Sequence, residues 1–458
     1  MRRILPMLVL LFAATAYAQE ETRITVPYER FVLPNGLNVI LHEDHTTPTV
    51  SVNIWYHVGS GREKPGRTGF AHLFEHIMFE GSRHVPEGAF DEWLEAAGGS
   101  NNASTSQDRT NYYEDVPSNA LELALFLDSD RMGYLLDAMS PETVDGQRDV
   151  VKNERRQRLE NSPYGLAFPT MFENLFPPGH PYNWPVIGSM EDLSAASHDD
   201  VVEFFTRYYS PANASLAIAG DIDPEEARAL VEKWFSDVPA RAPVPPVDPP
   251  VAYLTEEKRP LLEDRVSLPR LYMAWLSPRL YAPGDAEMDV LASILTGGKN
   301  SRLYKRLVYD LQIAQDVSAF QYSLEHGSSF WIIATARAGH DLDELEEVIR
   351  EELDRIRMEP PSEREVQRAI NQYEAGFLRG LERVGGFGGK ADRLNGYFVR
   401  TGNPDYFNED LARYRAVDPI DIQAVAQTYL RDDGRVALSV VPEGQLELAA
   451  SGAGAKAE

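Results

Sequence analysis

A short segment in the middle of the chain divides it in two. Residues 240–250 read ARAPVPPVDPP and contain five prolines. Because proline lacks an amide hydrogen and fixes φ, such a segment is extended and forms neither a helix nor a central strand. At 458 residues the chain is also too long for one ordinary hydrophobic core. We therefore expect two halves joined by this linker.

The hydrophobic pattern predicts a similar order of elements in both halves. In the first half we expect strands at 31–33, 37–41, 50–56, 100–105, 110–113 and 215–219, and helices at 70–81, 90–97, 120–136, 141–159 and 224–235. In the second half we expect strands at 271–276, 316–322, 329–336 and 436–441, and helices at 286–295, 342–358, 362–382 and 419–430. Helices mixed with strands in this order indicate an α+β fold.

Residues 69–81 contain the motif with the clearest chemistry. His72, Glu75 and His76 spell H-x-x-E-H in an expected helix that stops at Gly81. Residues four apart differ by about 40° around a helix axis, so both imidazoles project from one face and can reach one divalent ion. Glu75 lies close enough to that face to hold an attacking water, and this order of residues is the inverzincin motif. A histidine in an apolar segment is more often a packing residue, so the motif alone does not establish a metal site.

The register of the two halves indicates that only the first carries this motif. Gly81 aligns with Gly297 at an offset of 216 residues. The same offset puts Met288, Leu291 and Ala292 where the first half has its two histidines and glutamate. We interpret the halves as copies of one unit, with chance similarity of common α/β patterns as the alternative.

A third ligand must come from elsewhere in the chain. A catalytic zinc site has three protein ligands and keeps one position for water. Glu154 lies in the helix expected at 141–159, and Glu160 directly follows that helix. Spacing alone does not choose between these two acids, and Glu154 could also be one more solvated acid on a charged helix.

A resemblance to a known family makes that choice. Beside the H-x-x-E-H motif and Glu154, the chain has further matching segments at 180–182 (HPY), 208–213 (YYSPAN), 220–221 (GD) and 297–303 (GGKNSRL). With these segments it resembles the pitrilysin (insulinase-like) zinc peptidases, and among them the smaller, processing-peptidase-like bacterial members. The resemblance implies two homologous α/β sandwich-like domains per chain, the pitrilysin-like metallohydrolase fold.

The resemblance also implies a zinc-dependent metalloendopeptidase that hydrolyses peptides or unfolded polypeptides. His72, His76 and Glu154 would bind one Zn²⁺ per chain, and Glu75 would be the general base. These residue types suit that chemistry, because two neutral imidazoles and one carboxylate leave the ion with net positive charge. The alternative is a non-catalytic subunit that binds peptides or assists assembly.

The chain departs from the family pattern in two places. Family members often have a supporting glutamate seven residues before the third ligand, where this chain has Gln147. The second half of the family also supplies an arginine and a tyrosine near the substrate carbonyl, where this chain has Val308 and Gln315. Because oxyanion donors lower the barrier by several kcal/mol, we expect a homologous partner subunit to provide them in a heterodimer.

The strand expected at 100–105 is a candidate surface for the substrate. It follows the motif helix and is interpreted as an edge strand, to which a peptide can add by backbone pairing. Asn102 and Ala103 are the residues expected to present their backbone to the substrate. An ordinary strand end capped by polar residues is the alternative.

Composition and the N-terminus bear on location and partners. The net charge of −27 argues against non-specific nucleic-acid binding, which needs a basic surface. Residues 1–18 have a basic start, a short apolar run and an A-x-A site, as in a secretory signal. No later apolar run is long enough to span a membrane, and the chain has no cysteine. We therefore expect an exported, periplasmic bacterial protein without a transmembrane segment after signal removal.

The sequence suggests the following boundaries. We predict a signal peptide at 1–18, a catalytic domain at 19–239, a linker at 240–258, a second domain without metal at 259–442 and a disordered tail at 443–458. The glycine-rich segment at 385–391 lacks the first glycine and the final Ser/Thr of a phosphate-binding loop, so we interpret it as a loop or hinge.

Overall fold

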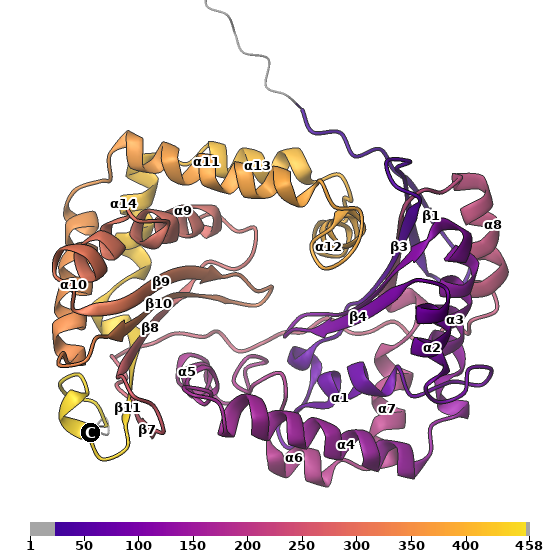
Figure 1. The fold of residues 1–458 in the computed structure, drawn as a ribbon, viewed down its shortest axis with the longest axis horizontal. Coiled ribbons are helices and arrows are strands. Elements are labelled where there is room, and N and C mark those ends of the chain that lie inside the picture. The colour runs from indigo at the N-terminus through magenta and orange to yellow at the C-terminus, as the bar shows by residue number, and fades with distance from the viewer. Residues whose placement is uncertain (1–22, 455–458) are drawn as a thin grey trace, which may run out of the picture.

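A computed structural model describes residues 23–454 of the chain. The predicted signal peptide at 1–18 and the last four residues, 455–458, lie outside this described part. Figure 1 shows two sheets, one on each side of the molecule, with helices packed around and between them. None of the described helices is long and apolar enough to cross a bilayer.

The first half is built on a six-stranded sheet with the order β1-β2-β6-β3-β5-β4. Its strands are β1 (Glu29–Val32), β2 (Asn38–Glu43), β3 (Thr49–Tyr56), β4 (Ser100–Thr105), β5 (Thr110–Pro117) and β6 (Ala214–Gly220). β2 and β6 are parallel, and the other neighbouring strands are antiparallel. β4 is therefore an edge strand, as the sequence predicted.

The second half repeats this sheet without the first strand. Its five strands have the order β7-β11-β8-β10-β9. They are β7 (Leu261–Asp264), β8 (Arg270–Ser277), β9 (Ala314–Tyr322), β10 (Ser328–Ala336) and β11 (Arg435–Pro442). β7 and β11 are parallel and the other neighbours are antiparallel, so strand order and direction match those of β2-β6-β3-β5-β4. The predicted fold of two homologous α/β domains is thereby confirmed.

Each sheet packs against the helices of its own half on one face. In the first half these are α1 (Phe70–Ile77), α2 (Ala89–Ala96), α3 (Leu121–Tyr134), α4 (Pro141–Arg155), α7 (His198–Tyr208) and α8 (Pro224–Phe235). In the second half they are α9 (Asp285–Thr296), α10 (Leu342–Met358), α11 (Glu363–Gly380) and α14 (Pro419–Tyr429). α6 (Met190–Ala195) and α13 (Phe407–Arg415) complete the set together with two helices that cross between the halves.

The two halves exchange these crossing helices. α5 (Ala167–Leu175), from the first half, packs its apolar side against β8, β10 and β11 of the second sheet. α12 (Lys390–Thr401), from the second half, packs against β2 and β6 of the first sheet. Figure 1 shows both helices in the space between the sheets. The second face of each sheet is therefore covered by a helix of the other half. α5, which follows α3 and α4, covers the second sheet, and α12, which follows α10 and α11, covers the first.

Two expectations about element ends need correction. The motif helix ends at Ile77, four residues before the predicted stop at Gly81, and the chain turns through Met78 and Phe79. The predicted disordered tail is wrong for residues 443–454. Ala450 is buried in the second core, and its amide nitrogen donates to Ser439 Oγ at 3.2 Å. The Ala/Gly-rich composition suggested disorder, but small residues are also what close packing against β11 requires.

The linker has the conformation that its prolines predict. Residues 240–250 contain no helix or strand in the structure. Arg62 from the first half donates to the Pro245 carbonyl at 2.5 Å, which holds the segment against that half.

Candidate metal centre and active site

The helix that carries H-x-x-E-H starts at a capped and tightly packed position. Gly69 precedes α1 with a φ of +89°, and a Cβ there would lie 2.6 Å from the Ile187 carbonyl oxygen, so only glycine fits. The Glu63 carboxylate accepts hydrogen bonds from the amide nitrogens of Gly69 (2.9 Å) and Ala71 (2.8 Å). Burial raises the pKa of Glu63 to about 8, although both amide donors favour its charged form. This buried cap fixes the first turn of α1 directly before His72.

The structure brings His72, His76 and Glu154 together. Their ligand atoms all lie within 4.8 Å of one another. Glu154 Oε2, from α4, lies 3.6 Å from His72 Nε2 and 3.2 Å from His76 Nε2. The two imidazole rings stand one helical turn apart with their centroids 4.9 Å from each other. Glu160 is not in this group; its carboxylate pairs with Arg155 instead.

The residues present fit a zinc ion. Two nitrogens and one oxygen at about 2.1 Å from a tetrahedral ion are about 3.4 Å apart, close to the two separations found here. Glu154 Oε2 is buried and faces no donor among the described residues other than the two imidazoles, and His72 Nδ1 has no partner among them. Burial lowers the pKa of His72 to about 4, so its ring is neutral at pH 7, as a metal ligand must be. His76 beside it lowers the pKa of Glu154 and keeps that carboxylate charged.

Glu75 lies between the ligands and the edge strand. Its carboxylate accepts a short hydrogen bond from the Thr105 hydroxyl at the end of β4. Burial raises the pKa of Glu75, and the Thr105 hydrogen bond opposes this rise. A carboxylate with a raised pKa, held in one orientation, is suited to accept and return a proton. Sequence reasoning missed Thr105: the sequence predicts a strand at 100–105, but no local pattern places its last residue against Glu75.

Two further side chains support the site from α4 and its extension, one by direct contact and one indirectly. The chain continues from α4 into a π-helical turn (Arg156–Glu160), and Arg158 in this turn donates to Glu154 Oε1 at 2.8 Å. Arg158 thus holds one carboxylate oxygen while the other faces the imidazoles. Gln147 is one step removed: its amide nitrogen donates to Glu80 Oε1, and Glu80 follows His76 by one helical turn. Gln147 thus reaches the motif helix through Glu80.

These residues line a cavity of about 690 Å³. Its polar wall is formed by the three ligand candidates, Glu75, Arg158 and the strand residues 102–105. Its apolar wall is formed by Leu159, Phe168, Pro169, Phe172, Pro185, Val186 and Ile187. A cavity of this size takes several residues of an extended peptide, within the range of about 300–1,000 Å³ usual for ligand sites.

The edge strand β4 lies in the wall of this cavity. Asn102 and Ala103 lie on β4 and both line the cavity. The Ala103 amide nitrogen donates to Asn102 Oδ1 at 2.8 Å, so a side chain occupies the donor that a neighbouring strand would use. A peptide that pairs with β4 would displace this amide oxygen.

The second half contributes one side chain to the cavity wall. Tyr322, at the end of β9, lines the cavity and donates to Gln107 Oε1 at 3.0 Å. Next to it, the Glu325 amide nitrogen donates to Asp108 Oδ2 at 3.0 Å, which fastens the β9–β10 turn to the first half. Val308 and Gln315 are not among the residues that line the cavity. Val308 instead packs against the second core.

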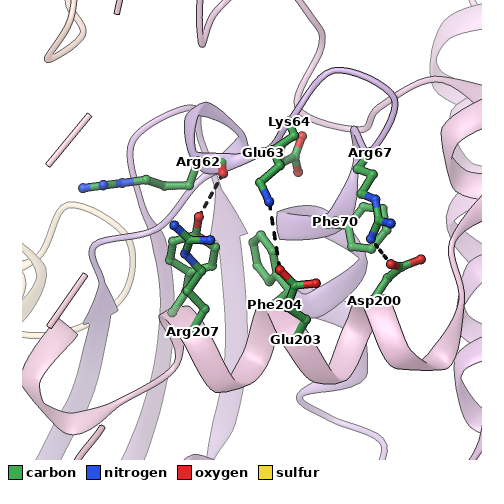
Figure 2. Close-up of a pocket in the computed structure, with 10 residues that line it drawn as sticks. Arg62, Glu63, Lys64, Arg67, Phe70, Asp200, Glu203, Phe204 and Arg207 are labelled. Carbon is green, nitrogen blue, oxygen red and sulfur yellow. Dashed lines mark hydrogen bonds and ion pairs between the residues drawn. The ribbon is translucent and has the colours of Figure 1, made fainter. Parts of the chain in front are cut away.

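A smaller hollow lies beside the start of α1, where Phe70 lines it. Figure 2 shows it between the loop at residues 62–67 and α7, where Arg67 pairs with Asp200 and Lys64 lies 4.0 Å from Glu203. Its volume is about 40 Å³, little more than the roughly 30 Å³ that one water occupies in the liquid. It is too small for a peptide side chain, so the larger cavity is the candidate active site.

Comparisons with known proteins agree with this fold. Residues 38–175 match the family model described as Insulinase (Peptidase family M16). Residues 195–373 match the model described as Peptidase M16 inactive domain. The first match contains α1 and α4, and the second contains the corresponding α9 and most of α11.

Relatives of this chain are named as proteases or peptidases. The zinc protease PqqE of Helicobacter pylori is 29% identical over 78% of this chain and 80% of its own length. A probable mitochondrial-processing peptidase subunit beta of Arabidopsis thaliana is 25% identical over 92% of this chain and 78% of its own. The crystal structure of a protease from Helicobacter pylori superposes with a TM-score of 0.84 at 26% identity, covering 91% of this chain and 99% of that one. The chain belongs to peptidase family M16, the insulinase or pitrilysin-like family of zinc proteases.

Proposed function

We propose that this protein is a zinc-dependent metalloendopeptidase that hydrolyses peptides or unfolded polypeptides. The observation that carries the proposal is the convergence of two imidazole nitrogens on one buried carboxylate oxygen that faces no other donor among the described residues. This convergence lies in the wall of a 690 Å³ cavity that also contains the half-buried Glu75 and an open strand edge. Metal ligands, a general base and a peptide-pairing edge in one cavity are the parts that metal-assisted peptide hydrolysis requires.

Each residue has a definite task in this proposal. His72, His76 and Glu154 hold one Zn²⁺ per chain, which when bound lowers the pKa of water and polarises the scissile carbonyl. A Glu75 carboxylate oxygen takes the proton from the attacking water and returns it to the leaving amine. The Thr105 hydroxyl keeps that carboxylate turned toward the cavity.

Strand pairing is proposed to place the substrate. The backbone of Asn102 and Ala103 would bond an extended peptide along β4, with the Asn102 side chain turning away from the Ala103 amide. Backbone pairing is independent of side chains, so the apolar wall that includes Phe168 and Phe172 would set preference. An extended chain can pair in this way and a folded protein cannot, which favours unfolded substrates.

The proposal is tested by peptide cleavage with and without a chelator. We expect a chelator to abolish cleavage, and Zn²⁺ to restore it. Glu75→Gln keeps the size of the side chain but cannot accept the proton, so cleavage should fall by about 10²–10⁴-fold. Cleavage that resists the chelator, or a fully active Glu75→Gln variant, would rule the proposal out.

We further propose that the active enzyme is a heterodimer with a homologous subunit. No lining residue of the cavity occupies the place of the family's arginine and tyrosine, since Val308 and Gln315 stand at those positions. A partner that lacks H-x-x-E-H but retains the arginine and tyrosine would supply them from across the cavity. Equal activity of the isolated chain and of a co-purified complex would exclude this requirement.

A non-catalytic role is the second candidate. It is favoured by Val308 and Gln315 and by the match of residues 195–373 to the M16 inactive domain. This candidate predicts no stoichiometric zinc and no loss of function in His72→Ala. The metalloendopeptidase proposal predicts one zinc per chain and its loss in the same variant.

The place of action is proposed to be the periplasm. Residues 1–18 have the pattern of a secretory signal. A solved relative with the same fold, PqqL of Escherichia coli, is described as a periplasmic protease; it has a TM-score of 0.76 at 18% identity, covering 93% of this chain and 49% of that one. Cell fractionation should find the chain, shortened to start at Gln19, in the periplasmic fraction. Recovery of the full-length chain in the cytoplasm would contradict this proposal.

A further inference from the structure

A second cavity lies where α12 of the second half covers the first sheet. Its volume is about 240 Å³. Trp55 on β3 and Arg109 at the start of β5 line it from the sheet, and Arg393 and Arg400 line it from α12. It is below the roughly 300–1,000 Å³ of sites for whole small molecules, and suits one side chain or one chain end.

Among the described residues, the three arginines at this cavity form no direct ion pair with a carboxylate, although Asp392 lies near enough to Arg109 to favour its charge. Arg109 is 7% exposed and donates to Ser104 O (2.6 Å), Ser104 Oγ (2.6 Å) and Asn111 Oδ1 (2.9 Å). Arg393 donates to the backbone carbonyls of Gly388 (3.1 Å) and Phe377 (3.2 Å). In the described part of the chain, no ion pair joins any of the three, including Arg400, to an acid. Three guanidinium groups around one cavity are unusual in a chain with a net charge of −27.

The two acids in the wall already have donors. Asp392 accepts from Trp55 Nε1 (2.7 Å), Asn111 Nδ2 (2.9 Å) and the Gly388 amide (2.8 Å). Asp410 accepts from the Tyr397 hydroxyl (2.8 Å) and from Arg413 (2.8 Å). Both carboxylates are therefore held in the wall, and the arginines retain donor capacity toward the cavity.

The walls favour a ligand that is planar and anionic at one end. Arg400 lies over the indole of Trp55, with its guanidinium carbon 5.0 Å from the ring centroid, and Arg109 lies at 5.3 Å from the same indole. Aromatic stacking keeps guanidinium planes in fixed orientations, and planar guanidinium groups bind carboxylates with two parallel hydrogen bonds.

Arg109 also connects this cavity to the candidate active site. Its bonds to Ser104 fix strand β4, and Ser104 lines the metal-centre cavity. The segment 104–109 thus lines both cavities, with Ser104 and Gln107 at the active-site cavity and Arg109 at the arginine cavity. A peptide held along β4 could place a residue or its end beyond this segment.

We propose that the arginine cavity is a carboxylate-binding site for the peptide substrate, formed by Arg109, Arg393 and Arg400. The proposal rests on the proposed function, because it assigns this second site to the same substrate. The group that this site would bind is a carboxylate, either of an acidic side chain or of the C-terminus of the peptide.

Binding to the inactive Glu75→Gln chain tests the proposal without relying on cleavage. The probes are three fluorescein-labelled short peptides of one neutral sequence: a free acid, its C-terminal amide, and the amide with one internal glutamate. Anisotropy titrations should show at least one carboxylate peptide binding about tenfold more tightly than the plain amide, with the difference shrinking at high salt. The free acid identifies the chain end as the ligand, and the glutamate peptide identifies a side chain.

Variants locate the effect. Arg393→Gln and Arg400→Gln, added together to the Glu75→Gln chain, should remove the preference for the carboxylate peptide and leave binding of the plain amide within about twofold. Arg400→Lys should keep part of that preference. Arg364→Gln is the matched control, because Arg364 is exposed and lies about 20 Å along α11 from Phe377 at the cavity. Circular dichroism and the melting temperature check that each variant is folded.

The outcomes separate this proposal from the proposed function. Equal binding of all three peptides, binding of none, or a preference that survives the double substitution would overturn the carboxylate site. If the wild-type chain with its partner then still cleaves peptides, the peptidase proposal stands alone. A preference that depends on the arginines in a chain that never cleaves would support the carboxylate site and refute the peptidase.

Discussion

The two halves of this molecule share one scaffold and differ in what they bury. α1 and α9 occupy equivalent places after β3 and β8, and both pack into the core of their half. Where α1 presents two histidines and a glutamate, α9 has Met288, Leu291 and Ala292, all at most 5% exposed. The scaffold therefore does not need the polar residues for folding, and their presence in one half indicates a function.

The same contrast holds for the long helices that pack beside them. On α4, the buried Glu154 Oε2 faces two imidazole nitrogens and no other donor among the described residues. On α11, Glu374, which aligns with Glu154 at an offset of 220 residues, is paired with Arg415 at 2.5 Å, as an ordinary charged side chain would be. A buried polar atom that lacks its full set of hydrogen bonds costs up to about 1–3 kcal/mol, so the first half accepts a loss of stability that the second half avoids. Metal binding would offset that loss.

The largest expected effect comes from removing a ligand candidate from one half only. His76→Ala leaves two ligands, and we expect it to lose stoichiometric zinc and all measurable cleavage. Glu374→Gln changes the equivalent position of Glu154 in the second half and should keep both. Metal analysis of the purified variants by mass spectrometry measures this, and zinc retained by His76→Ala would contradict the assignment.

The next effect concerns stability and should be confined to the second half. Leu291→Ala opens a cavity in the apolar core around α9, and we expect the free energy of unfolding to fall by about 2–4 kcal/mol. Zinc content per folded chain should not change, because α9 provides no ligand. Urea unfolding with metal analysis measures both. A loss of zinc in a folded Leu291→Ala protein would show that the halves are less independent than this comparison suggests.

A smaller effect is expected from the hydroxyl that orients the general base. Thr105→Val keeps the shape of the side chain but removes the hydrogen bond to Glu75. We expect kcat to fall about tenfold, with zinc content unchanged and KM affected little. Thr105→Ser restores the hydroxyl and should recover most of the activity. Equal kcat in Thr105→Val and the wild type would show that this contact has no role in orientation.

The smallest effect is a difference in acid sensitivity between the two long helices. Arg302 lowers the pKa of Glu365 at the start of α11 to about 2, and Ser362 completes a capping box with it. A depressed carboxyl pKa stabilises the folded state above the unfolded pKa of about 4.3, and this contribution disappears as the pH falls toward 2.

We therefore expect Glu365→Gln to be less stable than the wild type by up to about 1 kcal/mol above pH 5, and equally stable near pH 2. Thr143→Val is the control, because Thr143 is the third residue after the capping serine of α4, as Glu365 is in α11, but is not an acid; it should show no such pH dependence. Urea unfolding at several pH values measures the difference. A constant difference between Glu365→Gln and the wild type from pH 7 to pH 2 would contradict the assignment.

Local patterns in the sequence predicted most of the scaffold. The alternation at β3, the proline start of α8 and the repeated order of elements are each short-range signals, and the structure has these elements close to the expected bounds. That His72 and His76 lie on one face of a helix, with Glu75 near it, follows from the helical period of 3.6 residues alone. Selecting Glu154 over Glu160 required the family resemblance, because both acids lie near the end of the same charged helix.

The remaining features depend on contacts between distant residues. The exchange of α5 and α12 buries faces whose partners are more than a hundred residues away, so no local pattern marks them. The ordered tail depends on β11, and the Thr105 and Tyr322 contacts depend on how β4 and β9 approach the cavity. The Glu63 cap lies seven residues before the helix it stabilises, too far for the usual capping pattern.

The most direct test of the central claim is anomalous diffraction at the zinc edge from crystals of the zinc-loaded chain. We predict one strong peak per chain, bonded to the Nε2 atoms of His72 and His76 and to the Glu154 carboxylate, with Glu75 beside the open position. A peak at any other group of residues, or a structure in which Glu154 turns away from both imidazoles, would contradict it.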